Sequence, residues 1–148
     1  MKKVLLINGS PNEKGCTALA LEEIASTLKK RGIESDIKQI GKKPVAGCIA
    51  CYSCARTGRC AFNDAVNEII ESLDSYGALV VGSPVYYGSA TGQICCLLDR
   101  LFFAGGRLMD GKIGACVVSC RRGGASAAFD RLNKYFLMNN MPLASSQY

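Results

Sequence analysis

The sequence feature that most constrains the fold is a pair of short apolar runs that lead into the same tripeptide. Residues 4–7 (VLLI) and 78–81 (ALVV) are continuous and apolar, and Gly-Ser-Pro follows them at Gly9 and at Gly82. Runs of this length without alternation are typical of strands buried on both faces of a parallel sheet. Parallel strands need long crossover connections, which are usually helices. We therefore expect helices between the strands of this chain.

Strand-like and helix-like patterns alternate along the rest of the sequence. Apolar residues recur at helical spacing over residues 17–31, and Gly32 predicts the end of that helix. Residues 33–40 alternate between apolar and polar and predict a more exposed strand. The other predicted elements are helices over 64–73 (capped by Asp64), 92–103 and 125–139, strands over 113–118 and from 142–145, a Gly-rich connection over 104–111 and a Cys-rich loop over 47–63.

This alternation predicts a single α/β domain over residues 1–148, with a parallel sheet and helices on both faces. The fifth strand is reached only at residue 142, and no helix follows it in the sequence. We expect that a C-terminal helix is missing, so that either the chain is cut short or something else covers that face.

Charge and composition restrict the function. Lys and Arg number 18 against 12 Asp and Glu, giving a net charge of +6, but the cations form no long block. This favours an anionic small molecule over a nucleic acid as the partner. The chain has no His, which removes the commonest general base near neutral pH and the commonest metal ligand. Any metal must therefore be bound mainly by sulfur.

Cysteine usage predicts a cytoplasmic chain. Nine Cys is an odd number that does not suit a fully paired secreted scaffold. The apolar run 4–7 is too short for the core of a signal peptide, and no run approaches the ~18 apolar residues of a membrane span. We expect no membrane partner, and cysteines that are thiols or metal ligands.

The loop after the first strand has the composition of a phosphate site. Ser10, Asn12 and Thr17 supply side-chain donors, and the backbone N–H groups from Gly15 to Thr17 open the following helix, where an anion is favoured. The loop matches neither G-x-G-x-x-G nor a Walker A motif, which argues against a dinucleotide site of the Rossmann type and against a P-loop NTPase. An ordinary capped turn between strand and helix is the alternative.

Two further loops follow predicted strands. The segment 82–89 places Tyr86 and Tyr87 beside Pro and Gly, where aromatic side chains can face a flat ring. The segment 119–124 offers two Arg side chains and flexible glycine backbone. The carboxyl ends of parallel strands meet at one edge of a sheet, where ligands of such sheets bind. We therefore expect all three loops to contact one ligand.

Four motifs of the chain resemble those of the NADPH-dependent FMN reductases of the flavodoxin-like superfamily. They are Gly-Ser-Pro-x-x-x-Gly-x-Thr at 9–17, Ser-Pro-Val-Tyr-Tyr-Gly-Ser at 83–89, Asp99-Arg100-Leu101 and the Arg-Arg-Gly-Gly run that begins at Arg121. The resemblance covers essentially the whole chain. It implies a doubly wound five-stranded sheet of order 2-1-3-4-5. It also implies an FMN site formed by Ser10, Asn12, Gly15, Cys16 and Thr17 at the phosphate, and by Pro84, Val85, Tyr86, Tyr87, Gly88, Ser119, Cys120, Arg121, Arg122, Gly123 and Gly124 at the ring.

Four cysteines at close spacing form the second distinctive motif, Cys48-x-x-Cys51-x-x-Cys54-x5-Cys60. Soft thiolate ligands suit an Fe–S cluster or zinc, and four Cys suit a [4Fe–4S] cluster. Structural zinc sites more often use two widely separated pairs. Free thiols or disulfides remain the other alternative. The run resembles the compact motif of iron–sulfur flavoproteins, which implies electron exchange between a cluster and FMN, generally across a subunit interface.

The predicted function is that of an FMN-dependent oxidoreductase, which takes hydride from NAD(P)H and passes electrons to a small-molecule or protein acceptor, through a [4Fe–4S] cluster. Flavin carries this chemistry, so no catalytic side chain is expected. Arg121 or Arg122 would attract the anionic nicotinamide cofactor. The alternatives are a cluster-free NAD(P)H:FMN or quinone reductase, a flavodoxin-type electron carrier, and a metal-binding or redox-sensing module without flavin.

Assembly is predicted from surface features. The ring-facing loops leave one flavin face open, the fifth strand is uncovered, and apolar residues 101–103 precede a Gly-rich segment. Together these features predict a homodimer or homotetramer. Asp99 and Arg100 are expected to form a structural or interface ion pair.

Overall fold

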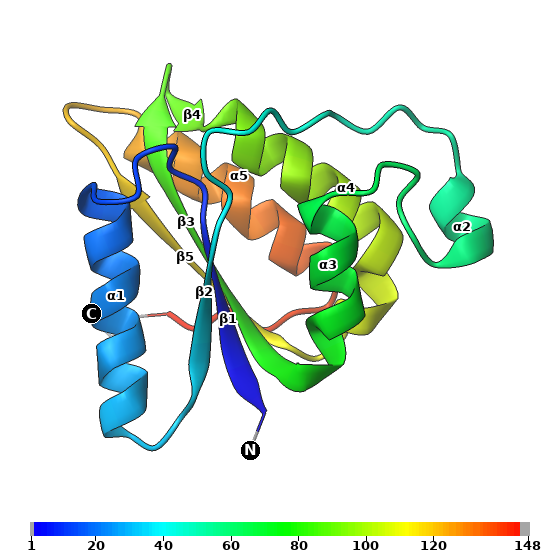
Figure 1. The fold of residues 1–148 in the computed structure, drawn as a ribbon. Helices are drawn as coiled ribbons and strands as arrows, with labels where there is room; N and C mark the ends of the chain where they lie inside the picture. The colour runs from blue at the N-terminus through cyan, green and yellow to red at the C-terminus, as the bar shows by residue number, and fades with distance from the viewer. Residues whose placement is uncertain (1, 146–148) are drawn as a thin grey trace.

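The computed structural model describes residues 2–145 and shows a parallel sheet with helices on both faces (Figure 1). The elements are β1 (Lys3–Asn8), α1 (Cys16–Lys30), β2 (Ser35–Gln39), α2 (Ser53–Thr57), α3 (Ala65–Ser72), a 3-10 turn (Leu73–Ser75), β3 (Tyr76–Tyr86), β4 (Ser89–Ala90), α4 (Gly92–Met109), β5 (Ile113–Ser119) and α5 (Ala125–Leu137).

The strand order β2-β1-β3-β5 confirms the predicted doubly wound sheet. All of these neighbours are parallel, and the short β4 is attached to β3 in the antiparallel sense. The predicted fifth strand is present beyond β5 as one parallel bridge between Gly114 and Leu143. Gly114 N–H donates to the carbonyl of Pro142 at 2.9 Å, and Ala144 N–H donates to the carbonyl of Gly114 at 2.9 Å. Residues 146–148 lie outside the described part of the chain.

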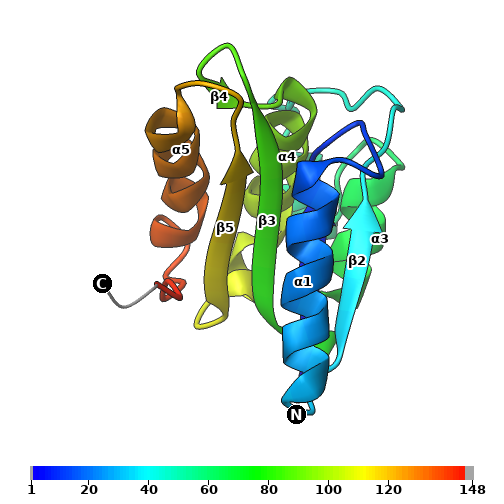
Figure 2. The same ribbon diagram turned by 90° about the vertical axis from the view of Figure 1, so that its left-hand side faces the viewer.

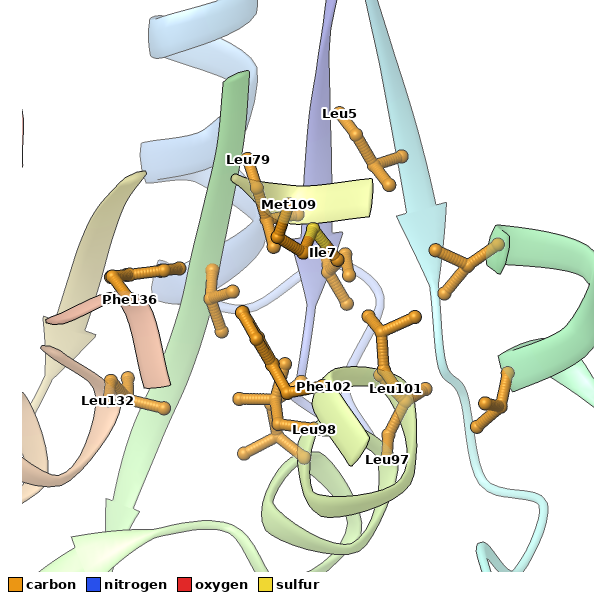
Figure 3. Packing of buried hydrophobic residues seen from close by; sticks show 14 of the residues in the cluster. Leu5, Ile7, Leu79, Leu97, Leu98, Leu101, Phe102, Met109, Leu132 and Phe136 are labelled. Carbon is orange, nitrogen blue, oxygen red and sulfur yellow. The ribbon is translucent and has the colours of Figure 1, made fainter. Parts of the chain in front are cut away.

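The larger core lies between the sheet and the helices α3, α4 and α5. Figure 3 shows α4 directing Leu97, Leu98, Leu101 and Phe102 toward β1 and β3, while Phe136 of α5 enters from the side. Each of the five side chains is buried, and full burial of such a side chain stabilises a fold by about 1.5–3 kcal/mol. The apolar helix faces that the sequence predicts are therefore the faces that hold these helices on the sheet.

The opposite face of the sheet is covered by α1 within the described residues, as Figure 2 shows. Leu21 of α1 is fully buried against Val4, Leu6 and Val80. The expectation of helices on both faces is thus confirmed. No helix within residues 2–145 is both long enough and apolar enough to cross a membrane.

Helix α4 corrects one prediction. The segment 104–111 was expected to be a Gly-rich connection, but α4 continues through Gly105 to Met109. A Cβ at Gly105 would lie 3.3 Å from Leu73 and 3.4 Å from Ile70. The glycine therefore serves close packing of α4 against α3, although glycine costs about 1 kcal/mol in a helix interior relative to Ala.

Candidate functional site

Three loops meet at the carboxyl edge of the sheet, at the top of Figure 1: the β1–α1 loop, the β3–β4 hairpin and the β5–α5 loop. This edge is where chain order reverses between β1 and β3. Ligands of doubly wound sheets bind at such a switch point. The positions singled out in the sequence for FMN therefore lie on loops of one edge.

The β1–α1 loop is shaped by a series of short side-chain contacts. Asn8 Oδ1 accepts the N–H of Ser10 at 3.0 Å, Ser10 Oγ accepts the N–H of Asn12 at 3.1 Å, and Asn12 Oδ1 accepts the N–H of Lys14 at 3.2 Å. These are the turns that Asn and Ser favour beside their own backbone. Ser10 is buried, whereas Asn12 is exposed with its amide nitrogen beside Gly15.

Helix α1 begins without a side-chain cap. Its N-cap is Gly15, no side chain accepts from the first turn, and that turn contains no acidic residue. The first N–H groups of a helix have no partner within the helix, and they favour a bound anion. Cys16 is exposed, and buried Thr17 contacts Ser119 at the end of β5, with 2.9 Å between their hydroxyl oxygens.

The second loop differs from its prediction because β3 extends to Tyr86. Val85 pairs with Ala90 and Tyr86 with Ser89, so the segment is a hairpin rather than an irregular loop. Its two-residue turn has positive φ at Tyr87 (50°) and at Gly88 (74°), the combination that a type I′ turn requires. The Tyr87 side chain is fully exposed at the tip. Pro84 and Val85 are half-buried.

The third loop approaches the hairpin closely. A Cβ at Gly124 would lie 2.7 Å from the Cα of Gly88, and Gly124 has φ +88°. Only glycine fits this position without strain. Residues 120–123 are exposed. Within residues 2–145, neither Arg121 nor Arg122 forms a salt bridge.

Two supporting residues, Thr91 and Gln39, were missed by sequence reasoning. Thr91 Oγ1 donates to the carbonyl of Gly9 at 2.8 Å, and Ser83 Oγ accepts the N–H of Thr91 at 3.0 Å, so the first two loops are held together. Gln39 Nε2 donates to the carbonyl of Ser10 at 2.6 Å. Thr91 was identifiable as the cap of α4, whose Ile94 N–H it accepts. The hydrogen bond from Gln39 to Ser10 depends on tertiary packing, and no local sequence pattern indicates it.

The four clustered cysteines lie on one loop outside the sheet. The chain leaves β2, passes above α4 and turns back through α2 to α3 (Figure 1). All four cysteines line one small cavity of about 20 Å³, together with side chains that include Phe62 and Phe103. The four are Cys48, Cys51, Cys54 and Cys60.

The backbone around Cys51 is unusual. Ala50 and Tyr52 have φ of 51° and 55°, values uncommon for residues other than glycine, and they flank Cys51 on both sides. Runs that include left-handed residues direct backbone N–H groups into anion-binding concavities, including Fe–S sites. Among residues 2–145, no group of three or more His, Cys, Asp or Glu side chains is close enough to hold a metal ion. The thiols therefore share a cavity without converging on one point.

The prediction of an ion pair between the neighbours Asp99 and Arg100 is wrong. Arg100 points into the protein and binds Asp64 at 2.7 and 2.8 Å, whereas Asp99 accepts a hydrogen bond from the Tyr135 hydroxyl. Adjacent residues on a helix point in different directions, which is why the local pairing fails. Burial alone would raise the pKa of Asp64, but the hydrogen bonds from Arg100 and from the N–H of Val66 outweigh it and hold that pKa below its usual value.

Two cysteines outside the motif occupy structural positions. Cys95 is buried on α4 and accepts a hydrogen bond from Arg131 Nε at 3.1 Å. Cys116 is half-buried on β5, and burial raises the pKa of its thiol to about 11. A thiol with this pKa is almost entirely protonated near neutral pH and reacts slowly.

Comparison with known proteins agrees with this geometry. The sequence profile of the NADPH-dependent FMN reductases matches residues 2–148. The chain is 31% identical over 142 residues to an iron–sulfur flavoprotein of Methanocaldococcus jannaschii, covering 94% of this chain and 74% of that protein. It is 35% identical over 139 residues to an iron–sulfur flavoprotein of Archaeoglobus fulgidus, covering 91% of this chain and 68% of that protein.

A solved structure of a flavodoxin from the domain Archaea superposes with a TM-score of 0.67 at 16% identity, covering 97% of this chain and 79% of that chain. At this identity the match shows the fold, and it confirms the flavodoxin-like architecture. Fold, loop positions and profile thus agree, and the chain belongs to the NADPH-dependent FMN reductase family, whose members are FMN-containing NAD(P)H oxidoreductases.

Proposed function

We propose that the three loops of the carboxyl edge bind FMN in this chain. The FMN phosphate is assigned to the uncapped start of α1, with Ser10, Asn12 and Thr17 around it. The supporting observation is that the first turn of α1 has neither a side-chain cap nor an acidic residue. A helix start of this kind attracts a phosphate through its N–H groups and its dipole.

The flavin ring is assigned to the space beside the β3–β4 hairpin and the β5–α5 loop. Exposed Tyr86 and Tyr87 offer aromatic faces, and the close approach of Gly124 to Gly88 brings the third loop beside them. When bound, FMN supplies hydride acceptance from NAD(P)H. Arg121 and Arg122 are exposed and form no salt bridge within residues 2–145, and in this proposal they attract the phosphates of the nicotinamide cofactor.

The cysteine loop is proposed to hold a [4Fe–4S] cluster that exchanges electrons with the flavin. One observation carries this proposal: all four thiols of the motif line the same cavity. The donor set fits, because four soft sulfur ligands suit an iron–sulfur cluster and the chain contains no His. The left-handed residues beside Cys51 add backbone N–H groups that favour an anionic cluster. Loading requires the loop to bring the sulfurs closer together.

The position of the cysteine loop favours electron transfer between copies of the chain. In Figure 1 the part of the loop around α2 lies on the far side of α4 from the sheet, whereas the three loops assigned to FMN lie at the top of the sheet. We therefore propose a homodimer or homotetramer in which the cysteine loop of one copy lies near the flavin loops of another. A small-molecule or protein acceptor and a cytoplasmic location complete the proposal.

The direct test is analysis of protein purified without oxygen. FMN, iron and acid-labile sulfide are quantified on one sample, and its mass is measured by light scattering. We expect about four iron atoms per FMN, as a cluster with four Cys ligands requires, in a particle larger than one chain. Cys51→Ser should lose most of the iron and retain FMN. Cys116→Ser, which alters a cysteine outside the motif, should retain both.

Other outcomes favour specific alternatives. FMN without iron or sulfide would leave a cluster-free NAD(P)H:FMN or quinone reductase. Zinc without sulfide would make the loop a structural zinc site. A monomer at micromolar concentration would contradict transfer between copies.

A further inference from the structure

Arg100 is a buried arginine whose polar contacts are all made with one loop. Its side chain is 1% exposed, although Arg is rarely fully buried unless it is paired. Both oxygens of Asp64 accept from its Nη atoms, and Nη1 also donates to the carbonyl of Ala46 at 3.2 Å. The guanidinium carbon lies 4.8 Å from the centre of the Phe62 ring. These partners lie before and after the cysteine motif, so Arg100 joins the two ends of the loop that carries it.

The remaining nitrogen of Arg100 contacts one cysteine of the motif. Nε donates to the sulfur of Cys60 at 3.2 Å. The backbone of Cys60 is held as well, since its N–H donates to Asn67 Oδ1 at 2.8 Å and its carbonyl accepts from Asn67 Nδ2 at 3.0 Å. Cys60 is therefore fixed by α3 and α4 together, whereas Cys48 and Cys51 are exposed.

A guanidinium at this position has two physical effects. It limits the orientations of Cys60, so that one ligand of the motif is in place before any metal binds. It also directs an N–H dipole at a sulfur, and hydrogen bonds to ligand sulfurs favour the more reduced, more negative state of an iron–sulfur centre. Asp64 offsets much of the charge of Arg100 at long range, but it does not remove the N–H directed at the sulfur.

We propose that Arg100 is a positioning residue of the cysteine site, which preorganises the loop through Asp64 and Ala46 and raises the reduction potential of the bound centre through its hydrogen bond to Cys60. The inference on potential rests on the proposed cluster, whereas the inference on loop order does not. An experiment can therefore contradict the effect on potential and leave the effect on loop order standing.

The test compares wild type with Arg100→Lys, which keeps the positive charge and loses the planar fork and the Nε–H. Arg107→Lys, an exposed position on the same helix, is the matched control. We expect Arg100→Lys to lose iron to a chelator about tenfold faster, a typical cost of removing a partner of a metal ligand. Its reduction potential should be lower than that of wild type. In metal-free protein, amides of residues 46–64 should exchange faster, with β1 and β3 unchanged.

Equal iron loss, potential and amide exchange in wild type and Arg100→Lys would overturn the proposal and leave the cluster intact. A wild type that takes up no iron would remove the cluster and the inference on potential, and amide exchange in metal-free protein would still decide the inference on loop order. If Arg100→Lys does not fold, Asp64→Asn replaces it, since that change keeps Arg100 and weakens its anchor. If the amides of residues 46–64 exchange as slowly in Asp64→Asn as in wild type, the proposal is overturned.

Discussion

At the scale of single residues, the β1–α1 loop is shaped by its own side chains and by side chains that reach it from distant elements. Ser10, Asn12 and Gly15 follow an apolar strand directly, so their place at the carboxyl edge could be inferred from sequence. Thr91 and Gln39 hold the same loop from a distant helix and strand, and no local pattern indicates such contacts. For the same reason Arg100 was assigned to its neighbour Asp99, although its partner Asp64 lies 36 positions away.

Asn12 provides a test at this scale. Asn12→Ala removes an exposed amide beside the start of α1, so the affinity for FMN should fall about tenfold, or ~1.4 kcal/mol. The affinity for riboflavin, which lacks the phosphate, should stay unchanged. Titration followed by flavin fluorescence measures both. Asn63→Ala, an exposed change outside the flavin loops, is the control. Equal losses for FMN and riboflavin would contradict the assignment of the phosphate to this loop.

At the scale of elements, hydrophobic periodicity and turn residues such as Gly and Pro located most helices and strands but not their lengths. Gly-Ser-Pro was interpreted as the end of the second apolar strand, yet β3 continues through Ser83 and Pro84 to Tyr86. Proline is tolerated there because β5 pairs along β3 in a parallel register that ends at Pro84 and Ser119. The hairpin that follows depends on positive φ at Tyr87, a conformation that the residue type does not indicate.

We expect one substitution in the hairpin turn to change the stability of the protein and its affinity for FMN in opposite directions. Tyr87→Asn should raise the free energy of unfolding of the FMN-free protein by about 0.5–1 kcal/mol, because Asn-Gly suits a type I′ turn and Tyr at positive φ is strained. The same change should weaken FMN binding, because it removes an exposed aromatic side chain at the proposed ring site. Urea unfolding and FMN titration measure the two effects. Tyr86→Asn, in extended backbone, should instead lower stability, and a destabilised Tyr87→Asn would contradict the interpretation of the turn.

At the scale of the whole molecule, the parallel sheet was accessible from sequence because buried strands and amphipathic helices alternate so regularly, whereas the strand order followed from the resemblance to the FMN reductases. The cysteine loop was not, since residues 41–63 carry no periodicity and their position is set by contacts with α3 and α4. The four cysteines of the motif could therefore be named from the sequence, but the cavity that they share and the arginine beside it could not.

The most direct measurement of the central claim is the absorption spectrum of the FMN-loaded protein, recorded without oxygen before and after addition of NADPH and, separately, NADH. A reductase built on these three loops predicts that the flavin bands bleach with at least one of the two nucleotides, and that the bleached protein regains them when an acceptor is added. Flavin bands that persist with both nucleotides but bleach with dithionite would contradict the account and identify an electron carrier that receives its electrons from another protein.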